Sequence, residues 1–203
     1  MPNTTIPEPE DAKKWFTSDT KFNHLYPASI QMMARRHWTP LHTAYKAANF
    51  LAAENGVKIL DIGSGVGKFC LAAACYKPLS FFYGVEQRKQ LVNYANEAAE
   101  ILSLENVSFI HSNFTQLDIK PYDHFYFFNA FYENLVDTAR IDESIDYSGE
   151  LYNYYNRYLF KLLDQKPAGT RLATFHSLED EIPRSYHVVD TDADNLLKCW
   201  IKV

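Results

Sequence analysis

The sequence predicts an α/β fold, with a doubly wound and mostly parallel sheet, a C-terminal antiparallel hairpin and a helical cap at the N-terminus. From residue 57 onward, short apolar runs alternate with amphipathic stretches of about 10 to 15 residues, which favours parallel strands joined by helices. Two apolar runs close the chain with only a short acidic turn between them, which favours a paired antiparallel hairpin.

The N-terminal part, residues 1–38, is expected to form a tail and a helical cap before a domain that spans residues 39–203. The first nine residues contain three prolines, which is typical of a flexible tail. Residues 10–17 and 27–38 are each expected to form a short helix.

A stronger helix is predicted over residues 39–56. Thr39 can cap it, Pro40 suits its first position, and Gly56 suits its end. Apolar residues recur along it at helical spacing, which indicates one buried face.

The remaining pattern sets the order of strands and helices. Strands are predicted over residues 57–62, 80–85, 107–111, 124–129 and 170–177, helices over residues 66–76, 87–104 and 149–165, and the hairpin over residues 185–191 and 196–203. Residues 133–148 follow neither pattern and are longer than a typical connection. We therefore expect a partly helical insertion on the substrate side.

Composition bounds the environment and the partners. No run of 18 apolar residues occurs and the N-terminus lacks the features of a secretion signal, so neither a membrane span nor export is expected. An odd count of three cysteines suggests buried thiols in a reducing, cytoplasmic setting. The net charge of −5 argues against a broad nucleic-acid-binding face, although Arg35 and Arg36 could form a local basic patch. None of these features indicates an oligomeric state.

Three glycines lie between the first predicted strand and the helix that follows it. Gly63, Gly65 and Gly67 permit a tight turn and allow a ligand to approach the main chain closely. The helix beyond them offers free N–H groups and the positive end of its dipole. A small ligand with polar or anionic parts is therefore expected to bind at this loop.

Three ligand classes compete for the loop. The dinucleotide fingerprint needs Gly-x-Gly-x-x-Gly, whereas only Val66 separates the last two glycines here. The phosphate-binding loop of nucleotide hydrolases needs Ser or Thr after its lysine, whereas Phe69 follows Lys68. S-adenosylmethionine carries an ammonium and a carboxylate but no phosphate. Asp61, two residues before the first glycine, suits its cationic side and would repel a pyrophosphate, so this third ligand is favoured.

Polar residues at the next two strand ends fit the same ligand. A carboxylate at Glu86 can accept hydrogen bonds from both hydroxyls of a ribose, although dinucleotide-binding folds share this feature. The amide oxygen of Asn113 can accept from the adenine amino group, and Phe114 can pack near the purine.

These stretches together resemble class I S-adenosylmethionine-dependent methyltransferases. "LDIGSGVG" resembles their glycine motif, "YGVEQ" their ribose-binding acid and "SNF" their adenine-loop motif, with Asn113 where the family often has Asp. The resemblance covers roughly residues 39–203. It implies a Rossmann-like fold, S-adenosylmethionine as cofactor, and a cofactor site that also includes Thr39, Ser64, Gln87 and Asn129.

Within that superfamily, "DIGSGVGKFCLAAA" and "YGVEQRKQLVNYA" look most like the non-SET histone-lysine methyltransferases and their bacterial relatives. "FFNAFYENL" is similar to an Asn-Asn-Phe stretch of those proteins. The resemblance implies N-methylation of a protein lysine, although this chain lacks a basic tail for contact with nucleosomes or DNA.

Asn129 ends the fourth predicted strand, where open parallel sheets place their reacting groups. Amine methyltransferases often carry Asn-Pro-Pro-Tyr there, whereas this chain has Asn129-Ala130-Phe131-Tyr132, which disfavours a nucleobase amine as acceptor. We expect Asn129 to orient the nucleophile beside the cofactor, and Phe131 and Tyr132 to shape the acceptor pocket.

Other functions and simpler structural roles remain open at this point. The alternatives are a small-molecule methyltransferase, a non-catalytic S-adenosylmethionine-binding protein and, disfavoured by the glycine spacing, a nicotinamide oxidoreductase. Asn113 could simply cap a turn, and Glu86 could stabilise a helix start. His176, at the end of the fifth strand, could be a general base or a polar strand-end residue. The seven histidines show no metal-ligand spacing, so no metal is expected.

Overall fold

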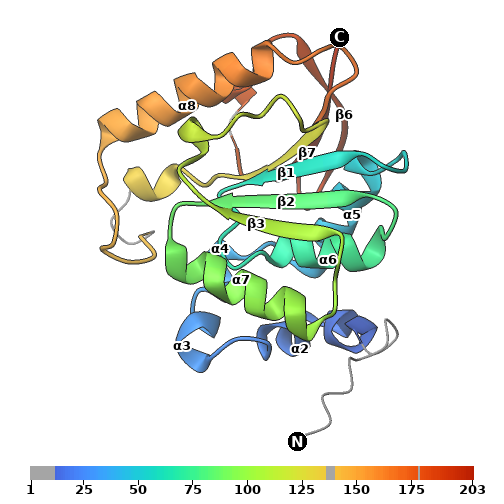
Figure 1. Cartoon of the computed structure of the whole chain (residues 1–203). Helices are drawn as coiled ribbons and strands as arrows, with labels where there is room; N and C mark the ends of the chain where they lie inside the picture. The colour runs from blue at the N-terminus through green and yellow to red at the C-terminus, as the bar shows by residue number, and fades with distance from the viewer. Residues whose placement is uncertain (1–11, 136–139, 178) are drawn as a thin grey trace, which may run out of the picture.

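The computed structural model describes residues 12–135, 140–177 and 179–203. Its seven strands form one sheet in the order β3-β2-β1-β4-β5-β7-β6 (Figure 1). The strands are β1 (Lys58–Ile62), β2 (Phe81–Glu86), β3 (Val107–His111), β4 (His124–Phe128), β5 (Arg171–Phe175), β6 (Tyr186–Asp192) and β7 (Leu197–Lys202). The first five pair in parallel, and β7 pairs antiparallel with both β5 and β6. The predicted fold class is confirmed.

Helices cover both faces of the sheet (Figure 1). One face packs against α5 (Leu41–Leu51), α6 (Lys68–Tyr76) and α7 (Lys89–Ile101), and the other packs against α8 (Gly149–Asp164). The shorter elements are η1 (Lys14–Thr17), α2 (Asp19–Asn23), α3 (Ala28–Gln31), α4 (Ala34–His37), η2 (Phe114–Gln116), η3 (Tyr132–Asn134) and η5 (Glu179–Glu181).

The strands are apolar on both sides because both sides are buried. In β4, Tyr126 packs on the α5–α7 side, whereas Phe125 and Phe127 pack on the α8 side. In β1, Ile59 and Leu60 divide in the same way. Side chains of a strand alternate between the two faces, so one short run supplies both hydrophobic cores.

The N-terminal cap is fixed to the start of the central domain. Phe22 is fully buried, and the Tyr26 hydroxyl donates to the main-chain oxygen of Val66 at 2.9 Å. Asp19 Oδ1 accepts from the Leu41 N–H at 3.1 Å and from Lys68 Nζ at 2.5 Å. The cap therefore contacts the glycine loop directly, through residues distant in sequence.

Two helix predictions need correction. The single helix expected over residues 27–38 is divided into α3 and α4 by a turn. Thr39 does not cap α5, because its hydroxyl pairs with the Tyr126 hydroxyl at 2.9 Å, and Asp19 satisfies the Leu41 N–H instead. Pro40 stands one position before the helix, with an extended backbone.

The segment expected to be a partly helical insertion, residues 133–148, is helical at its start in the part that the structure describes. Its helical part is η3, and residues 140–148 contain no helix, while residues 136–139 lie outside the described part of the chain. Within the described ranges, no helix has both the length and the apolar character needed to cross a bilayer. Cys70 and Cys199 are buried, as expected, whereas Cys75 is only partly buried, and all three are free thiols.

Candidate active site

The candidate site lies where the carboxyl ends of the central strands meet. The chain leaves β1 toward β2 on one side, while β4 pairs with β1 on the other side. Such a reversal opens a crevice at the strand ends, where open α/β sheets bind ligands. A cavity of 830 Å³ occupies this position, and the residues after β1, β2, β4 and β5 line it together with α4 and α8.

The glycine loop requires glycine for measurable reasons. All three glycines have positive φ angles, at 76° for Gly63, 54° for Gly65 and 83° for Gly67. A Cβ atom on Gly63 would lie 2.3 Å from the Ala130 Cβ, and one on Gly67 would lie 2.4 Å from the Phe109 ring. Gly63 and Gly65 line the cavity, so the loop lets a ligand reach the main chain.

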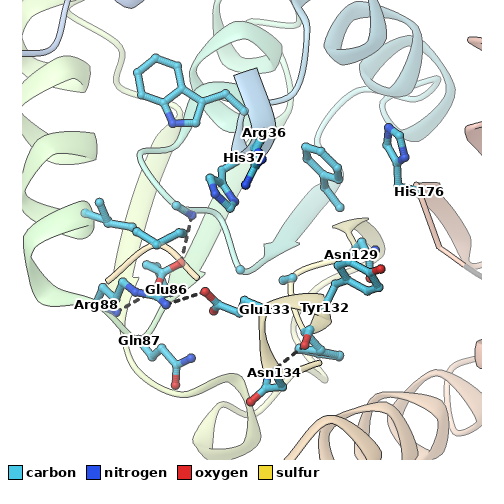
Figure 2. Close-up of a pocket in the computed structure, with 18 of the residues that line it drawn as sticks. Arg36, His37, Glu86, Gln87, Arg88, Asn129, Tyr132, Glu133, Asn134 and His176 are labelled. Atoms are coloured by element: carbon cyan, nitrogen blue, oxygen red, sulfur yellow. Dashed lines mark hydrogen bonds and ion pairs between the residues drawn. The ribbon is translucent and has the colours of Figure 1, made fainter. Parts of the chain in front are cut away.

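Glu86 is buried at the end of β2 and lines the same cavity. One carboxylate oxygen accepts from the Gly65 N–H at 3.1 Å, and the other accepts from the Arg88 N–H at 2.9 Å. Each oxygen retains capacity for a further hydrogen bond, which ribose hydroxyls could use. Gln87, the next residue, also lines the cavity (Figure 2).

Asp61 does not line the large cavity. It lies beneath the glycine loop, against a smaller cavity of 30 Å³ that Thr39, Ser64 and Tyr126 also line. Burial raises the pKa of Asp61 to about 8; the Cys70 thiol, donating at 3.7 Å, opposes this rise, whereas the charge of Glu86 adds to it.

Ser64 also lines the small cavity, and its hydroxyl lies against β2. Its oxygen is buried and has no hydrogen-bond partner within the part of the chain that the structure describes. It reaches this position because Gly84 has no side chain, since a Cβ there would lie 2.5 Å from Ser64 Oγ. Buried polar groups without partners are rare. The Asp61 carboxyl, which lines the same small cavity, could pair with a cationic group of a ligand.

Asn113 and Phe114 stand where the adenine was expected. Both line the cavity. The Asn113 amide oxygen, however, accepts from the Thr115 N–H at 3.0 Å and from the Thr115 hydroxyl at 2.9 Å, so it caps η2. Its amide nitrogen donates to the Tyr155 hydroxyl at 2.9 Å. Thr115 therefore already occupies the amide oxygen that was expected to accept a hydrogen bond from the adenine.

Asn129 follows β4 with a left-handed backbone, at a φ of 36°, and lines the cavity. His176, after β5, also has a positive φ, at 59°, and lines the cavity. The register pairs Phe128 with Phe175, so these two residues are neighbours along the sheet edge. Strained backbone at two adjacent strand ends is a common mark of a functional site. Burial lowers the pKa of His176, which keeps its imidazole neutral near pH 7.

Phe131 and Tyr132 differ in exposure. Phe131 is buried and stacks on Phe114, with ring centroids 5.0 Å apart. Tyr132 is 45% exposed, and both residues line the cavity. Figure 2 shows Tyr132 beside Asn129, on the side of the cavity away from Glu86.

Sequence reasoning did not place three of the residues that line the cavity. Arg36 and His37, on α4, form part of its wall (Figure 2). Arg88 is buried beside Glu86 and forms an ion pair with Glu133 at 2.7 Å. The basic pair before Trp38 was visible in the sequence, but its place at this cavity depends on how the cap folds. Among the residues that the structure describes, no three His, Cys, Asp or Glu side chains gather as a metal site requires.

Residues 53–196 match the model of a protein family described as "Methyltransferase domain". Among curated relatives, the chain is 48% identical over 54 residues to a tRNA (guanine-N(7)-)-methyltransferase of Synechococcus sp. (strain JA-3-3Ab), which covers 27% of this chain and 23% of that protein. It is 37% identical over 67 residues to the release factor glutamine methyltransferase of Buchnera aphidicola subsp. Baizongia pistaciae (strain Bp), which covers 33% and 24%. The chain thus spans about a quarter of the length of these relatives.

Solved structures share the fold. Magnesium protoporphyrin IX methyltransferase from Synechocystis PCC 6803, with bound S-adenosylmethionine, superposes with a TM-score of 0.58 and 16% identity over 100% of both chains. An RNA methyltransferase from Salinibacter ruber, in complex with S-adenosyl-L-homocysteine, superposes with a TM-score of 0.54 and 17% identity over 81% of this chain and 92% of that one. The chain belongs to the methyltransferase-domain family, whose members are S-adenosylmethionine-dependent methyltransferases with this Rossmann-like fold.

Proposed function

We propose that this protein transfers the methyl group of S-adenosylmethionine to a nitrogen atom of an acceptor that enters beside Asn129. The observation that carries the proposal is the shared cavity, because Glu86 on the cofactor side and Asn129 at the β4 end line one continuous space. Family membership supports the methyl donor, and the position of Asn129 supports the side from which the acceptor enters.

The residues on the cofactor side fit the two ends of S-adenosylmethionine. In this proposal the ribose hydroxyls donate to Glu86, beside Gln87, and the adenine packs near Phe114. The methionine end extends past the glycine loop toward the small cavity. There its ammonium would place a positive charge beside the Asp61 carboxyl.

The remaining residues on the cofactor side act at those same two ends. The orphaned Ser64 hydroxyl and Thr39 would complete the polar lining at the methionine end. Because Thr115 engages its oxygen, Asn113 is assigned the role of holding the η2 turn behind the adenine rather than accepting from it.

Methyl transfer from a sulfonium is a single displacement. The lone pair of the acceptor nitrogen forms a bond to the methyl carbon as the carbon–sulfur bond breaks, and the sulfur keeps the electron pair as S-adenosylhomocysteine forms. The methylated nitrogen then loses a proton to water. Holding the two reactants in line supplies much of the acceleration, so the protein needs acceptors of hydrogen bonds more than a strong base. The Asn129 amide oxygen is proposed to accept from the acceptor N–H, with Tyr132 and Phe131 shaping its pocket.

The acceptor group in this proposal is a nitrogen atom. The protein lysine expected from the sequence resemblance gains no support from the relatives, whose names give a release-factor glutamine and the N7 atom of guanine in tRNA. A small-molecule acceptor is compatible with the same cavity. The expectation against nucleic acid, drawn from a net charge of −5, stays a prediction.

Replacing Asn129 with alanine is expected to lower methyl transfer by about 100-fold while changing the affinity for S-adenosylmethionine by only a few fold, because a positioned hydrogen-bond partner acts mainly in the transition state. Asn195 provides a matched control. It is exposed in the turn between β6 and β7 and has a φ of 66°, so Asn195→Ala imposes similar backbone strain away from the cavity.

The measurement uses S-adenosylmethionine labelled on the methyl group, incubated with lysate of a strain that lacks this protein. We expect label to be transferred with the wild-type protein and with Asn195→Ala, and to be nearly absent with Asn129→Ala. Fractionation into protein, RNA and small molecules identifies the acceptor class. Equal labelling by Asn129→Ala and the wild type would show that Asn129 does not orient the acceptor.

A further inference from the structure

Arg88 connects the two sides of the cavity. It is buried directly after β2, and its main-chain N–H donates to Glu86. Its guanidinium donates to Glu133 at 2.7 Å, to the Tyr147 hydroxyl at 2.8 Å and to Asp142 at 3.2 Å, and it lies 3.6 Å from Glu86. One side chain thus contacts the cofactor-side carboxylate and three residues of the segment that follows β4. Figure 2 shows Arg88 beside Glu86 and Glu133.

The charges in this cluster depend on one another. Burial alone would lower the pKa of Arg88, but the charges of Glu133 and Glu86 raise it above its ordinary value. Burial raises the pKa of Glu133, and the charge of Arg88 opposes that rise. A buried ion pair of this kind adds little stability compared with apolar packing, whereas it fixes the relative position of its partners through directional hydrogen bonds.

Arg88 fixes the position of residues 131–135, which we call the acceptor wall of the cavity. Glu133 belongs to η3, and residues 131–135 all line the cavity. The Asn134 side chain donates to the Phe131 main-chain oxygen at 2.9 Å, which makes this turn a compact unit. Moving Glu133 would therefore move Tyr132 and the rest of this wall.

We propose that Arg88 is a positioning residue that couples the cofactor to the acceptor wall, so that binding of the cofactor at Glu86 orders residues 131–135. The inference rests on the proposed function, since it requires the ribose to engage Glu86. Hydroxyls that donate to Glu86 leave its charge in place and draw its carboxylate into a single orientation. Arg88, which shares that carboxylate, then holds Glu133 more rigidly.

Amide hydrogen exchange with S-adenosylhomocysteine as the probe tests this coupling. In the wild type we expect the ligand to slow exchange in two regions, residues 61–67 of the glycine loop and residues 131–135. In Glu133→Gln the ion pair with Arg88 is lost, so residues 131–135 should exchange at least about tenfold faster and should no longer respond to the ligand. Protection of residues 61–67 and the affinity for S-adenosylhomocysteine should change by only a few fold.

Two further variants keep the test decisive. Asp142→Asn removes a half-exposed partner of Arg88, so it should fold normally and show the same loss of response in weaker form. Lys46→Gln breaks the ion pair with Asp192 on the surface, where both side chains are 39% exposed, and should behave as the wild type. If neither Glu133→Gln nor Asp142→Asn weakens the response of residues 131–135 to the ligand, the coupling is wrong. If the wild type itself does not bind S-adenosylhomocysteine, the proposed function fails together with the coupling.

Discussion

Replacing Asp61 with asparagine is expected to stabilise the ligand-free protein at pH 8 while weakening its binding of S-adenosylmethionine. The pKa of Asp61 is raised to about 8 by burial, with a smaller contribution from the charge of Glu86. An unfolded aspartate ionises near pH 3.9, so between about pH 4 and pH 8 the folded protein holds a proton that the unfolded chain releases. The contribution of this group to stability is therefore complete below about pH 4 and is lost as the pH rises toward 8.

The expected size of this effect is large. A pKa of about 8 for Asp61 in the folded protein, against about 3.9 in the unfolded chain, corresponds to about 5 kcal/mol in the free energy of unfolding between the two ends of this pH range. Thermal unfolding of the wild type and Asp61→Asn should show similar midpoints near pH 4 and a variant midpoint higher by about 10 °C at pH 8. Comparison with the variant separates the contribution of Asp61 from that of every other ionisable group.

Ligand binding should favour the wild type over Asp61→Asn. An ammonium beside Asp61 favours its ionised form, so binding of S-adenosylmethionine near pH 7 should release a proton from this carboxyl. Titration calorimetry in buffers of different ionisation enthalpy measures that release. We expect it to disappear in Asp61→Asn, together with about tenfold or more of the affinity. An unchanged affinity and unchanged proton release in the variant would show that Asp61 does not interact with the ligand.

The substitution Glu86→Gln is expected to lower the affinity for S-adenosylmethionine by about 100-fold. Hydrogen bonds to a charged group each contribute about 1.5–3 kcal/mol, and the proposed contact involves two ribose hydroxyls. The loss also disturbs the Gly65 N–H, which donates to the same carboxylate at 3.1 Å. Glutamine preserves the volume of the side chain, so the change isolates the charge and one acceptor oxygen.

Glu181→Gln provides the matched control for this measurement. Glu181 also lines the cavity, but it lies on η5 rather than at the end of β2. Calorimetric titration should give the wild-type affinity for Glu181→Gln and a strongly reduced affinity for Glu86→Gln. Equal losses in the two variants would indicate a general effect of cavity charge, and no loss in Glu86→Gln would remove Glu86 from the cofactor site.

The sheet and the glycine loop were predictable because their signals are local. Strand β1, Lys58–Ile62, falls within the predicted residues 57–62, and β4, His124–Phe128, falls within residues 124–129. A short apolar run bounded by turn residues is sufficient to indicate a buried strand. Closely spaced glycines after such a run indicate the turn that the structure forms, with a positive φ at each of them.

The side-chain partners were not predictable, because they are distant in sequence. Asp19 accepts from the Leu41 N–H that Thr39 was expected to serve, and Thr39 pairs instead with Tyr126. Asp19 and Thr39 are both chemically suitable partners for this N–H, and only the packing of the N-terminal cap decides between them. For Asn113 the simpler alternative was the correct one. Its side chain caps η2 through the nearby Thr115, which is a local contact.

The cluster around Arg88 lay beyond sequence reasoning for a similar reason. Glu86 was identified because it ends an apolar strand, but the sequence gives no indication that Arg88 would turn inward toward Glu133 and Asp142. Those two acids belong to a segment without helical or strand periodicity, so no pattern predicts which of its side chains are buried. The burial of Arg88 and Glu133 follows from the tertiary fold alone.

The crevice at the ends of β1, β2 and β4 is proposed to bind S-adenosylmethionine rather than a dinucleotide. Isothermal titration of the wild-type protein with S-adenosylmethionine, and separately with NAD, distinguishes the two ligands. We expect saturable binding of S-adenosylmethionine at one site per chain and no measurable binding of NAD. Saturable binding of NAD, with no heat on addition of S-adenosylmethionine, would show that the crevice is a dinucleotide site.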